Sequence, residues 1–320
     1  MGLDIFLLIV GLILIAKGGD MFVDSSVHIG RTLNIPRFIV GGTLVSLATT
    51  TPELVVSATA STIGDSGIAL GNAVGSCICN IGLIVGAVAI MVPVSAAARD
   101  FANRALWMSA GGALVVIFSL DRTLSRPLGA VLLMLAGAYL VWDYLAIRRM
   151  RAGRDRTPPS AEERAALVRS VSLFVLGAGL IIVGSRLLVT SGQSVAAMLG
   201  IPSAIIGFSV VALGTSLPEL VTGVSAARKG VPDLSLGNIV GANVLNLFLI
   251  VGVSGTIQPL ELDSFTQWYA FPWMAVFFGI LIFLVRRNGH VGRRAGVGLL
   301  ILYLAYSLGL GILPTLGLAS

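Results

Sequence analysis

The chain alternates between long apolar runs and short polar segments that contain most of its arginines. Most of the runs are close to the length that crosses a bilayer as a helix, which is about 20 predominantly apolar residues. The pattern therefore predicts an all-α membrane protein with ten transmembrane helices. The runs cover residues 3–23, 38–60, 68–94, 105–120, 128–147, 167–189, 201–227, 234–257, 268–285 and 295–316.

Two segments of 51 residues, 36–86 and 202–252, repeat each other at an offset of 166 residues, with 22 identical positions. Helical periodicity alone would not produce this identity, so we interpret the segments as products of a duplication. The shared motifs are ATTTPEL at 48–54 and GTSLPEL at 214–220, followed by GNAVGSCICN at 71–80 and GNIVGANVLN at 237–246.

Each copy of the repeat belongs to a set of five apolar runs. After five crossings the second copy enters the membrane from the opposite face, so we expect two inverted five-helix repeats. Inverted repeats place equivalent residues around a pseudo-two-fold axis at the midplane, where many secondary transporters hold their substrate. The predicted units are a first repeat in residues 1–147, a basic linker in 148–166 and a second repeat in 167–320.

Composition supports the membrane assignment. Only 11% of the 320 residues are charged and 56% are hydrophobic, whereas a soluble domain has about 25% charged residues. The net charge of +6 and the pI near 9.9 would suggest nucleic-acid binding in a soluble chain. Here the basic residues flank membrane-spanning runs, so they indicate topology in a lipid bilayer and no nucleic-acid partner.

The basic residues concentrate in loops that fall on one side of the membrane when the runs are counted. By the positive-inside rule these loops and the linker face the cytoplasm of a cell inner membrane, and both termini lie outside. The loops contain Arg31 and Arg37, Arg99 and Arg104, Arg228 and Lys229, and Arg286, Arg287, Arg293 and Arg294, and the linker adds six arginines.

Each copy contains one glutamate directly after a proline, at Glu53 and Glu219. A proline within a helix removes the hydrogen bond to the carbonyl four residues earlier, which predicts broken helices 2 and 7. Thr49 and Thr215 lie four residues before the glutamates, so each hydroxyl shares a helix face with a carboxylate. Broken helices at membrane depth are tolerated where they line a cavity or bind an ion.

The next run of each copy repeats side chains at intervals of four residues, which places them on one helix face. Polar residues in such helices either bind ions or pack against neighbouring helices, and both interpretations remain open for Asn72, Asn238, Thr51 and Ser57. The repeated positions are Asn72, Ser76 and Asn80 in the first copy and Asn238, Ala242 and Asn246 in the second.

The combined set of side chains offers carboxylate, hydroxyl and amide oxygens. Cys77 and Cys79 point apart on one helix, so they are interpreted as small apolar packing residues and not as metal ligands. Oxygen ligands favour hard cations. Two uncompensated glutamates near the midplane would be costly, so a neutralising cation is expected. Ca²⁺ suits a flexible mixed set of oxygens better than Mg²⁺ does, and several Na⁺ ions could use the same oxygens.

The paired motifs resemble the two alpha repeats of the cation/calcium exchanger superfamily, and specifically a prokaryotic form of its sodium/calcium exchanger branch. The resemblance covers essentially the whole chain. It implies a ten-helix fold in which helices 2, 3, 7 and 8 form the ion site and helices 1 and 6 slide across them. It also implies that several Na⁺ ions entering drive one Ca²⁺ ion out.

The resemblance implies a metal-ligand set in this sequence. Glu53 and Glu219 are the implied shared ligands of Ca²⁺ and Na⁺, with Thr49 and Thr215 adding oxygens to the Ca²⁺ site. The remaining implied ligands are Ser76, Asn80, Thr50 and Ser216 for Na⁺, Ala212 through its backbone carbonyl, and Asn246 as the equivalent of Asn80.

Several positions depart from the family pattern. Ala48 replaces a glycine, Cys77 replaces an asparagine, and Ala242 replaces a serine that resembles an outer Na⁺ ligand in some members. Asn246 stands where potassium-dependent members typically have aspartate, which favours a potassium-independent exchanger. The number and affinity of Na⁺ ions therefore stay open.

The leading hypothesis is a secondary antiporter that exchanges Na⁺ for Ca²⁺ by alternating access. A proton-coupled Ca²⁺ antiporter on the same fold is the alternative, because neighbouring buried carboxylates repel and one can hold a proton. A cation channel is the third hypothesis. The sequence contains no nucleophile-base pair, His-rich metal motif or phosphate-binding loop beside the acids, so no enzyme, cofactor or obligatory protein partner is indicated.

Overall fold

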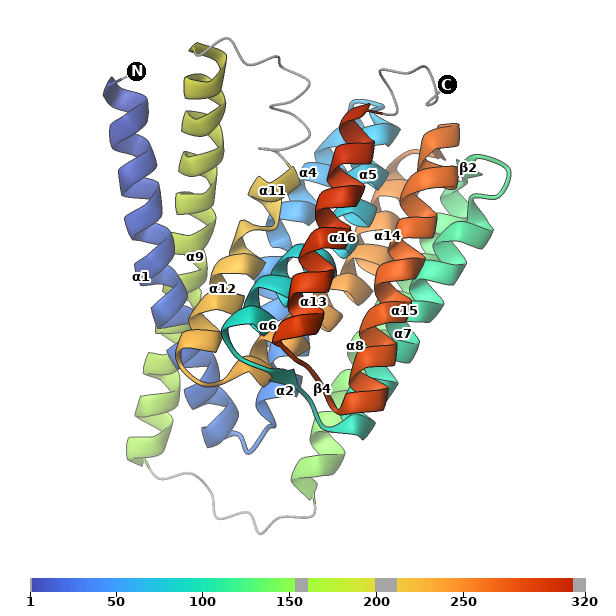
Figure 1. The fold of residues 1–320 in the computed structure, drawn as a ribbon. Coiled ribbons are helices and arrows are strands. Elements are labelled where there is room, and N and C mark those ends of the chain that lie inside the picture. The colour runs from blue at the N-terminus through green and yellow to red at the C-terminus, as the bar shows by residue number, and fades with distance from the viewer. Residues whose placement is uncertain (1, 153–160, 199–211, 313–320) are drawn as a thin grey trace.

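The computed structural model describes residues 2–152, 161–198 and 212–312, and helices make up nearly all of it (Figure 1). Within these residues, seven helices are long and apolar enough to cross a membrane, or eight if the bent pair Arg37–Thr49 and Thr51–Thr62 counts as one span. The fold is that of a helical membrane protein. The full set of ten helices stays a prediction, because runs 201–227 and 295–316 lie partly outside the described residues.

The first half of the chain contains long helices and helices interrupted by π-helical turns, which are labelled η. Its elements are α1 (Gly2–Thr32), α2 (Arg37–Val40), η1 (Gly41–Val45), α3 (Ser46–Thr49), α4 (Thr51–Thr62), α5 (Ser66–Cys79), η2 (Asn80–Val85), α6 (Gly86–Met91), β1 (Val94–Ser95), α7 (Ala98–Phe118), β2 (Thr123–Leu124) and α8 (Arg126–Ala152).

The second half repeats much of this order. Its elements are α9 (Ala161–Met198), α11 (Ala212–Thr215), α12 (Leu217–Arg228), α13 (Pro232–Leu245), η4 (Asn246–Ile250), α14 (Val251–Ile257), β3 (Leu260–Glu261), η5 (Thr266–Ala270), α15 (Phe271–Asn288), β4 (His290–Val291) and α16 (Arg293–Ile312). Both ends of the predicted linker are helical, because α8 extends to Ala152 and α9 begins at Ala161; the middle of the linker lies outside the described residues.

Both proline motifs begin a helix directly after a backbone break. Thr50, with φ −80° and ψ −3°, separates α3 from α4, and the two parts of this span meet at 43°. Ser216, the equivalent residue, has φ −90° and ψ 7° and separates α11 from α12. A proline in the first turn of α4 and α12 explains the matching breaks, because it cannot donate to the preceding turn.

Two interrupted helices, α5–η2–α6 and α13–η4–α14, form the centre of the molecule. In their most apolar stretches 72% and 89% of the residues are buried, compared with 17% for α9, 22% for α8 and 28% for α1. The less buried helices surround them and present apolar side chains outward. The motifs with asparagines and glycines therefore lie in the interior, away from lipid.

Glycines let the backbone of α13 come into direct contact with the backbone of the first broken helix. A Cβ atom built at Gly237 would lie 1.9 Å from the carbonyl oxygen of Phe38, and one at Gly241 would lie 2.5 Å from that of Gly42. Real Cβ atoms do not come so close to a carbonyl oxygen, so only glycine fits. This contact brings the second half's central helix against α2 and η1 of the first half.

The turns that follow α4 and α12 have the same geometry. Gly64 and Gly230, at equivalent positions, adopt φ values of 84° and 67°, which favour glycine. The N–H group of the next residue bonds a carbonyl five residues earlier, at 2.9 Å in both halves. The duplication is therefore visible in the backbone as well as in the sequence.

Two small antiparallel sheets connect loops of one half to loops of the other. β1 pairs with β4, and β2 pairs with β3. At the offset of 166 residues β1 corresponds to β3, and β2 corresponds to β4 within one residue, so the two sheets are equivalent. In Figure 1, β4 lies at the lower end of the molecule and β2 at the upper end. Equivalent loops at opposite ends are expected of inverted halves.

The helices α1 and α9 lie side by side at one edge of the molecule (Figure 1). Phe22 stacks on Phe174 between them, with ring centroids 4.5 Å apart. α1 also contacts α12, where Lys229 Nζ lies 2.7 Å from Asp24 Oδ1. Ser225 Oγ donates to Asp20 Oδ1 at 3.2 Å in the same contact. The helix that carries the second glutamate is thus attached to α1 by polar bonds.

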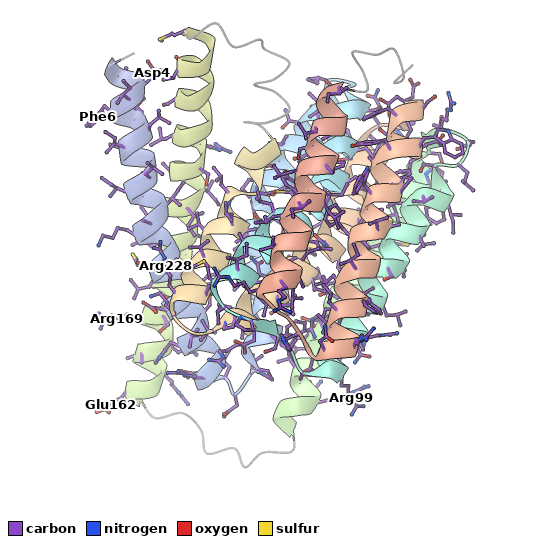
Figure 2. All side chains as sticks on the ribbon, viewed as in Figure 1. Asp4, Phe6, Arg99, Glu162, Arg169 and Arg228 are labelled. Atoms are coloured by element: carbon purple, nitrogen blue, oxygen red, sulfur yellow. The ribbon has the colours of Figure 1, made fainter. Side chains whose placement is uncertain are left out.

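Figure 2 labels charged residues at both ends of the molecule. Arg99 and Arg169 lie toward the lower end together with Glu162, Arg228 lies near mid-height, and Asp4 lies at the upper end. The two lower arginines agree with basic segments on one side of a bilayer. The side that faces the cytoplasm stays a prediction.

Arg104 corrects one expectation, because the prediction placed it in a cytoplasmic loop and the structure buries it inside α7. Its side chain is 2% exposed and forms an ion pair with Asp143 of α8. The guanidinium also lies 5.7 Å from the Phe38 ring and 5.6 Å from the Trp142 ring, within cation–π distance. An arginine ends an apolar run whether it is buried or exposed, so the hydrophobic pattern could not separate the two cases.

Candidate cation site

Each glutamate lies in the first turn of a helix that begins at a backbone break. Glu53 is in α4 and Glu219 is in α12, and both are 1% exposed. The N–H groups of a first turn lack intrahelical acceptors and form the positive end of the helix dipole. The local backbone therefore favours a negative charge at each glutamate.

Reciprocal hydrogen bonds join the two halves beside these glutamates. Thr49 Oγ1 donates to Asn238 Oδ1, and its equivalent Thr215 Oγ1 donates to Asn72 Oδ1, both at 3.1 Å. Each bond runs from the end of a broken helix to the central helix of the other half. The two motifs that follow, with their glutamates, are thereby brought into one region.

The carboxylates contact hydroxyl groups from the opposite half. Ser216 Oγ lies 3.5 Å from Glu53 Oε1 and 3.3 Å from Ser76 Oγ. The Thr49 side chain interacts with the Glu219 carboxylate. Both carboxylates are buried, so two ionised side chains in this region would repel each other unless a cation lay between them.

Several buried oxygens of the two acids and of predicted ligand side chains have no hydrogen-bond partner in the described part of the chain. A buried polar atom without a partner costs about 1–3 kcal/mol. A cation bound among these oxygens would pair with them and offset the negative charges. The unpaired atoms are Glu53 Oε2, Glu219 Oε2, Asn80 Oδ1, Asn246 Oδ1 and Thr50 Oγ1.

The charge balance of the site also points to a cation. Among residues 2–152, 161–198 and 212–312, no lysine or arginine pairs with either glutamate. In the same residues no three His, Cys, Asp or Glu side chains gather as a metal cluster. The available ligands are therefore carboxylate, hydroxyl and amide oxygens, which suit Ca²⁺ and Na⁺.

Ser216 and Thr49 contact the glutamates and Ser76 contacts Ser216, whereas cation binding by any predicted ligand stays a prediction. Ala212 begins α11, one turn before the second break, and its carbonyl contact likewise stays a prediction. Thr51 is exposed and donates to the carbonyl of Leu47, so it belongs to the outer face of the helix. The buried predicted ligands besides the glutamates are Thr49, Thr50, Ser76, Asn80, Thr215, Ser216 and Asn246.

Asn72 and Asn238 connect helices in this structure. Their side-chain oxygens accept the threonine bonds described above. Asn72 Nδ2 also donates to Ser57 Oγ at 2.9 Å and to the Glu53 carbonyl at 3.2 Å. For Asn72, Asn238 and Ser57 these bonds favour a packing role, which the sequence had left open.

The π-helical turns η2 and η4 begin at Asn80 and Asn246. Such turns are frequent at functional sites. The sequence reasoning missed Asn243, which is fully buried and accepts a hydrogen bond from Asn80 Nδ2 at 2.9 Å. The available signal was the repeat alignment, in which Asn243 is the equivalent of Cys77.

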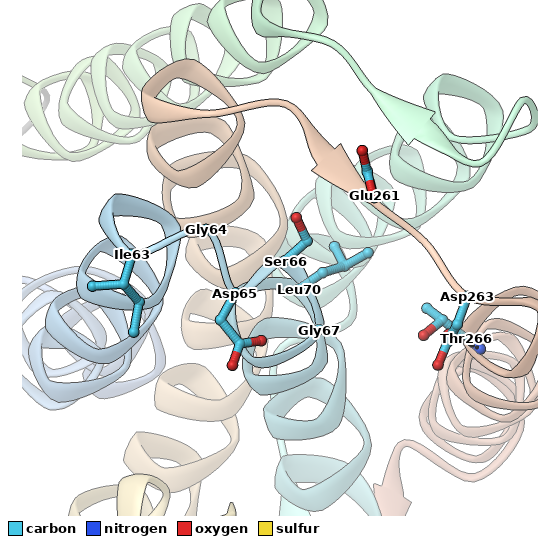
Figure 3. A pocket seen from close by; sticks show the side chains of 9 residues that line it. All are labelled: Ile63, Gly64, Asp65, Ser66, Gly67, Leu70, Glu261, Asp263 and Thr266. Atoms are coloured by element: carbon cyan, nitrogen blue, oxygen red, sulfur yellow. Dashed lines mark hydrogen bonds between the residues drawn. The ribbon is translucent and has the colours of Figure 1, made fainter.

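A separate cavity of about 530 Å³ opens beside the loop between α4 and α5 (Figure 3). Asp65 and Asp263 accept backbone hydrogen bonds from Ile68 and Thr266, so both carboxylates already serve local turns. No predicted ligand lines this cavity. Its lining residues are Ile63, Gly64, Asp65, Ser66, Gly67, Leu70, Glu261, Asp263 and Thr266.

The fold is that of a helical membrane protein, and two buried glutamates in its interior are accompanied by side chains with oxygen ligands. These features indicate an integral membrane transporter of cations. Known protein families agree with this class, because the model of the sodium/calcium exchanger protein family matches residues 3–145 and 169–311. The chain belongs to this family. The resemblance seen in the paired motifs is thereby confirmed.

Individual relatives match over nearly the whole chain. Sodium/calcium exchanger MaX1 of Methanosarcina acetivorans is 32% identical, over 95% of this chain and 97% of that protein. Inner membrane protein YrbG of Escherichia coli is 36% identical, over 91% of both chains. The sodium-calcium exchanger NCX_Mj, in a structure soaked with 10 mM Na⁺ and 10 mM Sr²⁺, matches with a TM-score of 0.84 and 30% identity, over 97% and 98% of the two chains. Family and fold together support cation/Ca²⁺ exchange and agree with the expected absence of enzymatic activity.

Proposed function

We propose that this protein is an antiporter that exchanges Na⁺ for Ca²⁺ across a cytoplasmic membrane by alternating access. The observation that carries the proposal is the set of buried oxygens of Glu53, Glu219 and the predicted ligands that have no hydrogen-bond partner among the described residues. These oxygens come from both halves of the chain, and two of them belong to buried carboxylates whose like charges would repel each other. A hard cation is the ligand that satisfies such a set.

In this proposal the two glutamates bind Ca²⁺ or Na⁺ in turn. One Ca²⁺ ion neutralises both carboxylates, with further oxygens from Thr49 and Thr215, and Na⁺ ions neutralise the same carboxylates when Ca²⁺ leaves. Because the charges are shared, the two cations compete, and the site is occupied before it is closed to water. The proposed Na⁺ ligands are Ser76, Asn80, Thr50, Ser216, Asn246 and the carbonyl of Ala212.

We further propose ten transmembrane helices in two inverted repeats, residues 1–147 and 167–320, joined by the basic linker 148–166. The equivalent sheets at opposite ends of the molecule support the inversion. The reciprocal bonds from Thr49 and Thr215 support a pseudo-two-fold axis through the site. The arginine-rich loops and the linker are proposed to face the cytoplasm, with both termini outside.

Uptake of radioactive Ca²⁺ into proteoliposomes tests the antiport directly. Vesicles loaded with Na⁺ and diluted into Na⁺-free medium, with pH clamped on both sides, should accumulate Ca²⁺. Collapse of the Na⁺ gradient with a sodium ionophore should abolish the uptake. Ca²⁺ accumulation that is independent of Na⁺ would contradict the proposal.

Proton coupling is the second candidate, and the unpaired Oε2 atoms of both glutamates favour it. Protonation of one carboxylate would relieve their mutual repulsion. The same vesicles with a proton gradient and no Na⁺ separate the candidates. Ca²⁺ uptake under that condition, at a rate equal to the Na⁺-driven rate, would establish proton coupling instead.

A further inference from the structure

Asn80 has a side-chain amide whose two ends face different surroundings. Its Nδ2 donates to Asn243 Oδ1 at 2.9 Å, and its Oδ1 is buried without a hydrogen-bond partner among the described residues. The nitrogen and oxygen ends of an asparagine amide have the same shape, so the hydrogen-bond network decides which end is left for another ligand. The nitrogen end is fixed here, and the oxygen end is left for another ligand.

Asn243 is itself held in one orientation. It is fully buried in α13, and its Nδ2 lies 3.5 Å from the carbonyl oxygen of Cys77 and 3.7 Å from the sulfur of Met108. Both of these neighbours are acceptors, so the amide nitrogen belongs on that side. The oxygen of Asn243 must then face Asn80, which accounts for the orientation of Asn80.

The equivalent place in the other half is built differently. At the offset of 166 residues Asn80 corresponds to Asn246, and Asn243 corresponds to Cys77. Asn246 also has a buried Oδ1 for which the described part of the chain offers no partner, and its side chain interacts with the Cys77 thiol. A thiol is a weak acceptor, so it orients an amide less firmly than a carboxamide oxygen does.

We propose that Asn243 is a positioning residue that holds Asn80 Oδ1 toward the transported cation, and that Cys77 provides no equivalent support for Asn246. The inference rests on the proposed Na⁺/Ca²⁺ exchange at this site. Asn243 does not contact the cation. It acts through Asn80, so the first half supplies the fixed amide oxygen and the second half supplies the more mobile one.

A double-mutant cycle on Ca²⁺ binding tests this role. Titration calorimetry of the purified protein with Ca²⁺ gives a Kd without requiring transport. Asn243→Cys, which copies the other half, should weaken Ca²⁺ binding by about tenfold, the effect of one hydrogen bond to a cation ligand. In an Asn80→Ala background the same change should have no further effect. Additive losses would overturn the proposal.

The reciprocal variant tests the proposal from the other half, and it replaces the weak contact between Cys77 Sγ and the Asn243 carbonyl, which are 3.8 Å apart. Cys77→Asn should support Asn246, so the loss of Ca²⁺ affinity caused by Asn246→Ala should grow from about twofold to about tenfold. An unchanged loss would overturn the proposal, even if Asn243→Cys fails to fold. The two proposals can fail separately. If the double-mutant cycle shows that Asn243 acts through Asn80 but the protein has no Na⁺-driven Ca²⁺ uptake, the antiport is contradicted and the role of Asn243 stands.

Discussion

Glu53 and Glu219 occupy the same place in their helices, but the side chains around them differ between the two halves. The backbone breaks, the threonines and the bonds from these threonines to asparagines are present twice. In the first half Ser76 and Ser57 supply hydroxyl groups near the site. The equivalent residues of the second half, Ala242 and Gly223, have no hydroxyl group. The charge of the site is therefore symmetric, and its supply of hydroxyl groups is not.

The surrounding helices differ more strongly. Arg104 and Asp143 form a buried ion pair in the first half. Their equivalents in the second half are Ala270 and Gly309, and a Cβ atom built at Gly309 would lie 1.8 Å from the Tyr269 hydroxyl. The Tyr269 side chain thus occupies the space beside Gly309 where the first half has the Asp143 carboxylate. The duplication preserved the acids and the backbone, while the packing behind them diverged.

The largest effect is expected from the feature that both halves share. Glu53→Gln and Glu219→Gln should each reduce Ca²⁺ transport to background, because one carboxylate cannot neutralise a divalent cation alone. Vesicle uptake measures this, with Glu261→Gln as a matched control, since Glu261 is exposed in β3. Normal transport in either site variant would remove that glutamate from the site.

The next largest effect is expected from the buried ion pair that only the first half contains. Arg104→Met or Asp143→Leu should lower the free energy of unfolding by about 3–5 kcal/mol, because each leaves an unpaired buried charge. The double variant should recover most of this loss. Thermal unfolding in detergent measures both, and the exposed Arg286→Met serves as the control. Equal losses in the single and double variants would contradict a mutual pair.

Exchange of hydroxyl groups between the halves should have an intermediate effect. Ser76→Ala should raise the half-saturating Na⁺ concentration by about threefold to tenfold, and Ala242→Ser should lower it, because a hydroxyl supplies one Na⁺ ligand. The Ca²⁺ affinity should change less. Na⁺-dependent uptake at fixed Ca²⁺ gives these values, and equal changes for both cations would show that neither position is selective for Na⁺.

The smallest effect concerns the asparagines that connect the halves. Ser57→Ala should destabilise the protein by about 1 kcal/mol, because Asn72 Nδ2 loses the closer of its two acceptors. Within the described residues Asn238 Nδ2 already lacks a partner, since Gly223 stands at the position equivalent to Ser57. Ser61→Ala is the control, because Ser61 bonds only within its own helix in the described contacts. Equal unfolding temperatures for Ser57→Ala and the wild type would contradict this account.

The sequence by itself determined the membrane class, the duplication, the two glutamates and the proline breaks beside them. These features depend on composition and on neighbouring residues, so an apolar run or a proline has the same meaning wherever the helix packs. The internal repeat also indicated which residues are equivalent. The family resemblance followed from the same local motifs.

Only the tertiary structure decided which helix faces meet. The bond from Asn80 to Asn243 joins residues 163 positions apart, and the bond from Thr49 to Asn238 joins residues 189 apart. The burial of Arg104 likewise depends on Asp143 of another helix. A polar residue in an apolar run looks the same whether it binds a cation, connects two helices or pairs with a buried charge, because its partner is supplied by a distant part of the chain.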